Sequence, residues 1–343
     1  MNRLFCGIDF HKNFSTVCIL SHDGKYKEIT EKCSDNVVKF LANKKIELIT
    51  IEASTGVHDF VSKLKSCGHL VKIINPNRFR AVGVNGKKTD RKDAELLAEF
   101  ARLDLTPSVH HKSIEARELK SLLVMREFII QTRVSQGNHI RGVLREYGIK
   151  IPKGKENFLE QGMESINKVE NGYIRNTLVD MFNRYRDGLD EEKKIDEKVK
   201  SFSNQDEVKR YKTIPGVGDI VALSFMAVID NVDRFKNSKH FASYCGLVPR
   251  EHSSAETKRM GSITRSGPEM LRRNLIHGAR SILKHQLKLN ETDSNILWAH
   301  RLKDRIGMNK AVVALAHRLA RILFVIARDK SSYGEFEVVK KSA

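Results

Sequence analysis

The sequence has no long hydrophobic run, few prolines and only one tryptophan. No stretch approaches the roughly 20 apolar residues that a membrane-spanning helix needs. Asp9, His11 and Lys12 interrupt the opening apolar segment, so no secretory leader is expected either. With 40% hydrophobic residues, six prolines and 21 glycines, the composition is typical of a folded soluble protein. The sequence therefore predicts a cytoplasmic protein without a membrane partner.

Cysteine is scarce and scattered along the chain. The five cysteines stand at positions 6, 18, 33, 67 and 245, and no two of them form a CxxC pair. None of the 13 histidines joins them at the spacing of a zinc finger. This pattern argues against a disulfide framework and against a structural zinc site, and reduced, mostly buried thiols are expected.

Acidic residues are outnumbered by basic ones, 42 against 61, which gives a formal net charge of +19 at pH 7. Residues 208–343 contain 25 basic and 12 acidic residues, so they hold +13 of that charge. Such an excess favours polyanionic partners through counterion release and long-range attraction, although charge alone does not identify them. At 343 residues the chain is long enough for more than one domain.

The first hundred residues alternate strand and helix patterns. Residues 3–10, 15–21 and 25–30 predict an antiparallel meander of three strands. The next segments predict a helix, a strand, a helix and a strand, followed by a helix from about Asp90. The order βββαβαβ resembles that of the ribonuclease-H-like (RuvC-like) nuclease fold. The expected fold class is therefore α/β in this part and mainly α in the rest.

The middle of the chain is helical and nearly neutral. Residues 113–147 and 178–202 carry apolar side chains at helical spacing, which predicts a helical hairpin or a coiled coil. Residues 106–207 contain 18 basic and 17 acidic residues. This balance favours a spacer or a self-association surface over a DNA-facing one.

The last third opens with a PGVG turn at residues 215–218, between two helical runs. This turn resembles the hairpin of helix-hairpin-helix modules, whose glycines let backbone N–H groups approach a phosphate. A helix–helix turn without a ligand explains it equally well. A polar loop follows at 249–267, then helices at 268–286 and 309–329. A loop of about 19 residues is long for a compact domain and often carries function.

Four acidic residues are candidates for a metal site. Asp9 ends the first predicted strand, and Glu52 ends a strand that this fold places beside it. Asp90 and Asp93 are three residues apart at a helix start, so their carboxylates project from one face. Such a cluster is unfavourable without cations, but it suits one or two Mg²⁺ ions, or Mn²⁺, that hold a scissile phosphate. The structural alternative is that Thr89 or Asp90 caps the helix, that the helix dipole favours Asp93, and that Asp9 satisfies a turn.

The polar loop contains a candidate nucleophile. Ser253 and Ser254 lie among basic residues that can neutralise a phosphate while a hydroxyl attacks it and becomes covalently linked to DNA. A serine pair in a loop is otherwise typical of a cap or a turn. The candidate nucleic-acid contacts are Lys87, Lys88, Arg250, Lys258, Arg259, Arg265, Arg272 and Arg273.

Together these motifs resemble the insertion-sequence 110 family of transposases, which includes the Piv-type DNA invertases. The resemblance covers most of residues 3–330 and is weakest across the middle helices. The segments that carry it, in order, are GIDFHK, IEASTG, INPNRFRAVGVNGKKTDRKDAELLAEF, TIPGVGDIVAL, FKNSKHFASYCGLVPREHSS and GSITRSGPEMLRRNLIHGAR.

The resemblance implies a division of the chain and a set of catalytic residues. It implies a RuvC-like domain at 1–108, a helical coiled-coil or dimerisation region at 109–205, a transposase domain at 206–335 and a tail at 336–343. The family's Asp-Glu-Asp-Asp tetrad falls on Asp9, Glu52, Asp90 and Asp93. The family's serine nucleophile matches Ser254, with Ser253 as the alternative. The family usually has glycine after this serine, whereas Ala255 stands here.

The resemblance also implies the partners. They are donor and target DNA, a non-coding bridge RNA that pairs with both, and further copies of the chain, as dimers that assemble into tetramers. In the family the tetrad of one subunit works with the serine of another. The sequence contains no recognition-helix or zinc-finger motif, which agrees with sequence choice by base pairing. We therefore expect a nucleoid-associated, prokaryotic DNA transposase. The alternatives are a Holliday-junction-type endonuclease that uses water and a non-catalytic nucleic-acid-binding protein.

Overall fold

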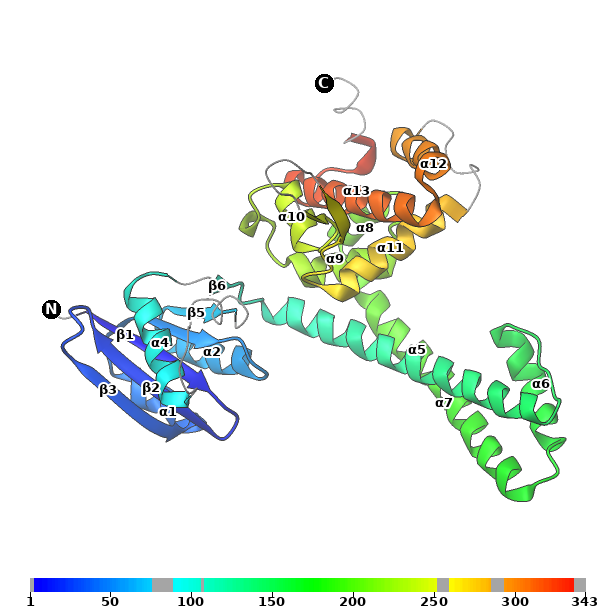
Figure 1. Cartoon of the computed structure of the whole chain (residues 1–343), viewed down its shortest axis with the longest axis horizontal. Helices are drawn as coiled ribbons and strands as arrows, with labels where there is room; N and C mark the ends of the chain where they lie inside the picture. The colour runs from blue at the N-terminus through cyan, green and yellow to red at the C-terminus, as the bar shows by residue number, and fades with distance from the viewer. Residues whose placement is uncertain (1–2, 76–88, 106–107, 252–258, 285–292, 336–343) are drawn as a thin grey trace. The chain divides into compact units, whose positions relative to one another are not determined.

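The structure is a computed structural model, and it describes residues 3–75, 89–105, 108–251, 259–284 and 293–335. These residues form two compact units, residues 1–111 and residues 112–343. The first unit is built on a β-sheet and the second is mostly helical, which confirms the predicted combination of α/β and α structure (Figure 1). Within the described ranges, no helix is both long and apolar enough to cross a membrane.

The first unit has one six-stranded sheet in the order β3-β2-β1-β4-β5-β6. Strands β1, β2 and β3 form the predicted antiparallel meander, and β4 and β5 continue the sheet parallel to β1. This arrangement fits the RuvC-like fold. The elements are β1 (Leu4–Phe10), β2 (Phe14–Ser21), β3 (Lys27–Cys33), α1 (Ser34–Ala42), β4 (Ile46–Glu52), α2 (Val57–Ser66), β5 (Val71–Ile74), α4 (Asp90–Arg102) and β6 (Ser108–Val109).

The two faces of the sheet are covered by different helices. Alternate side chains of β1, such as Cys6 and Ile8, pack into a core with α1 and α2. Gly7 faces α4, and a Cβ atom there would lie 2.1 Å from the backbone oxygen of Ala94, so the helix backbone rests directly on the strand (Figure 1). The Thr50 hydroxyl of β4 donates a hydrogen bond to the backbone oxygen of Leu97, at 2.6 Å. These contacts fix the start of α4 relative to the ends of β1 and β4.

The second unit begins with two long helices that pack against one another, α5 and α7, with α6 at their far end (Figure 1). The rings of Phe158, Phe182 and Tyr185 pack together in this part. Leu119 and Leu123 of α5 join the core of the C-terminal helices, so both parts form one unit. The elements are α5 (Ile114–Glu146), α6 (Lys155–Asn167), α7 (Gly172–Ser203), α8 (Asp206–Lys212), α9 (Asp219–Ile229), a 3₁₀ turn (Val232–Arg234), α10 (Ser238–Tyr244), β7 (Pro249–Glu251), β8 (Met260–Ile263), α11 (Glu269–Lys284), α12 (Ser294–Ile306) and α13 (Met308–Asp329).

The PGVG turn joins α8 to α9 and packs against α11. Gly216 has a φ of +78°, and a Cβ atom there would lie 2.6 Å from the Ile282 side chain. A Cβ atom on Gly278 of α11 would lie 2.2 Å from the backbone oxygen of Gly216. The two glycines therefore allow the turn and the helix to touch, which favours a helix–helix turn over a phosphate contact for Gly216.

Candidate active site

Asp9 is the next-to-last residue of β1 and lies on the sheet face that α4 covers. The residue is only 8% exposed. Burial raises the pKa of Asp9; His11 lowers it in part, and the negative charges of Asp90 and Asp93 raise it further. Because the charges of Asp90 and Asp93 disfavour the ionised form of Asp9, a cation beside these carboxylates would be favourable.

Glu52 is the last residue of β4, the strand next to β1. The parallel register pairs Gly7 with Thr50 and Ile8 with Ile51, so Glu52 follows beside Asp9. Residues that lie opposite one another on neighbouring strands point to the same face of the sheet. The Glu52 side chain therefore projects on the same side as Asp9. Glu52 is partly buried. The fold thus places two carboxylates at adjacent strand ends, as the sequence predicts.

Asp90 and Asp93 belong to the first turn of α4. The N-cap is Thr89, whose side-chain oxygen accepts a hydrogen bond from the Lys92 backbone N–H at 3.3 Å. The capping alternative therefore applies to Thr89. Asp90 is the first residue of the helix, and its carboxylate is exposed.

His11 is the residue of this site that the sequence motifs did not single out. Its Nε2 atom lies 3.3 Å from a carboxylate oxygen of Asp9 and 3.8 Å from one of Asp90. One ligand atom from each of these residues lies within 4.8 Å of the other two. The available signal was its position two residues after Asp9, where the chain leaves the strand.

The loop with the candidate nucleophile lies between β7 and β8. These strands pair antiparallel, with Pro249 opposite Ile263 and Glu251 opposite Met260. Ser253, Ser254 and Lys258 lie outside the described residues, as do Lys87 and Lys88 of the first unit. Their placement remains a prediction.

The described arginines around this loop differ in exposure. Arg250, Arg259 and Arg265 are exposed. Arg272 is only 8% exposed, and its guanidinium donates hydrogen bonds to the backbone oxygens of Cys245 and Ser266, at 3.2 and 3.0 Å. These bonds tie Ser266, in the segment between β8 and α11, to the end of α10. Arg273 is partly exposed and pairs with Glu127 of α5.

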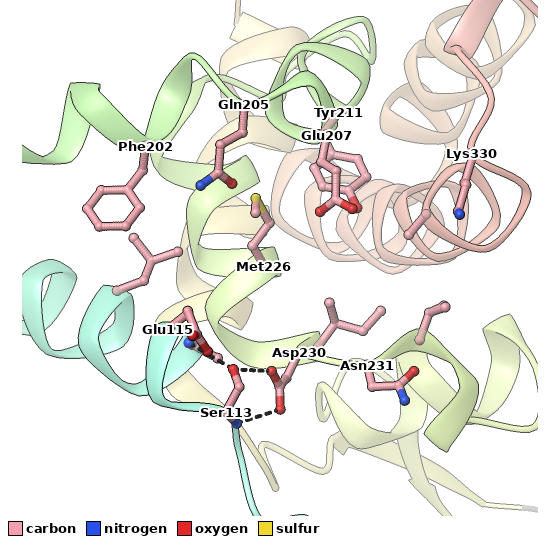
Figure 2. Close-up of a pocket in the computed structure, with 15 residues that line it drawn as sticks. Ser113, Glu115, Phe202, Gln205, Glu207, Tyr211, Met226, Asp230, Asn231 and Lys330 are labelled. Atoms are coloured by element: carbon pink, nitrogen blue, oxygen red, sulfur yellow. Dashed lines mark hydrogen bonds between the residues drawn. The ribbon is translucent and has the colours of Figure 1, made fainter.

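A separate pocket of about 410 Å³ lies in the second unit, at the start of α5 (Figure 2). The backbone N–H and hydroxyl of Ser113 both donate to the carboxylate of Asp230, at 3.0 and 2.7 Å (Figure 2). Ser113 is the N-cap of α5. None of the predicted site residues lines this pocket, so the contacts have a structural role at the helix start.

Comparison with known proteins finds matches to one transposase family in both units. Residues 6–149 match the family model of DEDD-type IS110 transposases, and residues 208–293 match that of the transposase IS116/IS110/IS902 family. A transposase for insertion sequence element IS1111A from Coxiella burnetii is 31% identical over 334 residues, which cover 95% of this chain and 90% of the relative. The chain belongs to the IS110 family of transposases.

Other relatives of this IS110 transposase agree. A putative transposase of Sinorhizobium fredii is 34% identical over 306 residues, which cover 88% of this chain and 78% of the relative. The pilin gene-inverting protein of Moraxella lacunata is 26% identical over 295 residues, which cover 79% and 80%. The chain is therefore an enzyme that cuts and rejoins DNA strands, and the non-catalytic alternative is wrong.

The acidic site of the transposase has the chemistry of a divalent-cation site. Asp9 and Asp90 offer carboxylate oxygens around one point, with Asp93 close enough to raise the pKa of Asp9. Carboxylate oxygens are the ligands that hard divalent cations prefer. The family model and this cluster together support the use of a divalent metal, without identifying the ion.

Proposed function

We propose that this transposase cleaves and rejoins DNA with Asp9, Glu52, Asp90 and Asp93 as metal-binding acids and Ser254 as the nucleophile. Mg²⁺ or Mn²⁺ is the proposed ion. The proposal is supported above all by three positions: Asp9 is the next-to-last residue of β1, Glu52 is the last residue of the neighbouring parallel strand β4, and Asp90 is the first residue of the helix that lies on them.

The proposed reaction is a transfer of the DNA phosphate to the serine. The Ser254 oxygen forms a bond to phosphorus, the bond from phosphorus to one sugar oxygen breaks, and that oxygen leaves as a sugar hydroxyl with the proton that the serine gives up. In rejoining, the hydroxyl of the exchanged strand attacks the phosphoserine and the serine hydroxyl is restored. A bound cation would neutralise the phosphate and stabilise its in-line displacement. The four carboxylates would hold this cation, and the basic residues of the loop would balance the charge of the phosphate.

Of the eight basic residues assigned to DNA or RNA, Arg272 is buried and Arg273 pairs with Glu127, and the other six fall into two groups. Arg250, Arg259 and Arg265 are exposed beside the serine loop and can contact phosphates directly. Lys87, Lys88 and Lys258 are assigned from the sequence alone. Such contacts make affinity fall steeply with salt.

The decisive experiment is the capture of the covalent intermediate. Wild-type protein and Ser253→Ala are expected to yield a protein–DNA adduct, whereas Ser254→Ala yields none. Asp9→Asn is expected to abolish cleavage while DNA binding is retained, because binding depends mainly on basic residues. Cleavage without an adduct in every variant would instead support an endonuclease that uses water.

We further propose that a bridge RNA supplies the sequence recognition and that dimers assemble into tetramers. The absence of a base-reading motif from the sequence supports the first part. RNA that copurifies with the protein should match DNA beside the gene. Mixed Asp9→Asn and Ser254→Ala subunits should recover strand exchange if acids and serine from different subunits act together. RNA unrelated to the element, or no recovery, contradicts these proposals.

A further inference from the structure

We propose that His11 is a ligand of the cation held by Asp9 and Asp90, and that its imidazole makes the site bind Mn²⁺ in preference to Mg²⁺. The inference rests on the proposed function, because it presupposes that the acidic cluster binds a metal. It adds a nitrogen ligand to a site that the tetrad alone would make purely from oxygen.

The turn between β1 and β2 fixes the position of the imidazole. His11 directly follows the last residue of β1, and its backbone N–H donates a hydrogen bond to the backbone oxygen of Phe14, at 3.2 Å. The His11 ring packs against the Phe14 ring with 5.2 Å between their centres. From this position Nε2 lies near both the Asp9 and the Asp90 carboxylates, at 3.3 and 3.8 Å. The nitrogen is therefore presented to the point that the two carboxylates share.

The proposed preference follows from the chemistry of the three donors. Mg²⁺ takes oxygen ligands and keeps several waters, whereas imidazole suits first-row transition metals. A site of carboxylates alone discriminates little between Mg²⁺ and Mn²⁺, so the nitrogen is the group that shifts the balance. The competing explanation is a plain hydrogen bond from Nε2–H to Asp9. The two explanations exclude one another at this atom, because a nitrogen that donates its proton has no lone pair for a metal.

The test is pulsed electron paramagnetic resonance of the full-length protein loaded with Mn²⁺. Wild type is expected to show modulation from a directly bound ¹⁴N nucleus, and His11→Gln is expected to lose it. His22→Gln is the matched control, because His22 is also exposed and lies near the opposite end of the β1–β2 pair. Since the His11 side chain is 46% exposed, its replacement is expected to leave the fold intact, and the melting temperature checks this.

Competition between the two ions gives a second readout. The ratio of Mn²⁺ to Mg²⁺ affinity is measured by displacing Mn²⁺ with Mg²⁺. His11→Gln should lower this ratio at least about tenfold, whereas His22→Gln should leave it unchanged. A wild-type spectrum without bound nitrogen, or an unchanged preference in His11→Gln, overturns the inference. Asp9→Asn separates this failure from that of the proposed function: if it leaves Mn²⁺ affinity unchanged, the acidic cluster is not the metal site at all.

Discussion

Gly7 links the packing of the sheet to the geometry of the acidic site, and its replacement tests that link. A Cβ atom at this position would lie 2.1 Å from the Ala94 oxygen and 2.2 Å from the Ala98 nitrogen, both in the backbone of α4. Because real Cβ atoms essentially never come within 3.0 Å of such atoms, α4 must retreat by about 1 Å at this point. Overpacking of this kind costs about 1–3 kcal/mol.

The same displacement should weaken the site. Asp90 and Asp93 move with α4, whereas Asp9 stays with β1, so the carboxylates proposed to bind the metal lose their spacing. A misplacement of about 1 Å can cost about 100-fold in rate. We expect Gly7→Ala to lower both the free energy of unfolding in urea and the affinity for Mn²⁺. The rate of DNA cleavage should fall by a larger factor than the Mn²⁺ affinity.

Gly142→Ala is the control for Gly7→Ala. Gly142 lies within α5, and among the described residues no atom apart from its chain neighbours and the nearby helix backbone lies within 4 Å of the position that a Cβ atom would take there. Alanine should therefore raise stability slightly, by about 0.5–1 kcal/mol. If Gly7→Ala matches wild type in both stability and Mn²⁺ affinity, the contact between β1 and α4 does not position the site.

Three further predictions concern stability and DNA binding. Burial, together with nearby positive charges, lowers the pKa of Lys112 to about 8. Between about pH 8 and 10.5 the unfolded chain therefore binds more protons than the folded chain, and this group makes the free energy of unfolding rise with pH. Urea titrations of Lys112→Met should lack that rise, and a pH dependence parallel to that of wild type would contradict the prediction. Asp230→Ala removes both hydrogen bonds to Ser113 and should cost about 1–2 kcal/mol in urea unfolding, whereas the exposed Asp233→Ala should cost almost nothing. Arg250→Gln should lower the salt slope of duplex-DNA affinity by about 0.9 if Arg250 contacts a phosphate, and an unchanged slope removes it from the interface.

The sequence predicted the framework of the acidic site because strand order carries long-range information. Once residues 3–10 and 47–53 are read as neighbouring parallel strands, Asp9 and Glu52 must end at the same edge. The details that depend on pairing were less accurate. The third strand was predicted at 25–30 but runs over Lys27–Cys33, because its extent is set by pairing with β2, from Leu20 opposite Lys27 to Phe14 opposite Cys33.

Two side chains show what local sequence patterns leave out. His11 was noted in the sequence only as a polar residue that interrupts an apolar run, and the turn to Phe14 brings its ring to the carboxylates. Arg272 was predicted from the sequence to contact nucleic acid. Gly246, with a φ of +68°, leaves room for the Arg272 guanidinium beside the Ser266 backbone, so this arginine is buried. The burial of Arg272 depends on contacts between segments far apart in the sequence, which spacing and composition do not reveal.

The fold holds Asp9 close to Asp90 and Asp93 although their negative charges repel one another. The cost of this repulsion in folding free energy can be measured. Asp9 is buried beside two other acids and its pKa is raised, so its ionisation costs the folded state free energy near neutral pH. Asp9→Asn removes that charge while its side-chain oxygen can still accept a hydrogen bond from His11. The variant should therefore melt at a higher temperature than wild type in a chelator. With saturating Mn²⁺ the order should reverse, because only wild type gains the free energy of metal binding. If Asp9→Asn is less stable in the chelator, the acids are not held together at a cost, and the electrostatic basis of the site is wrong.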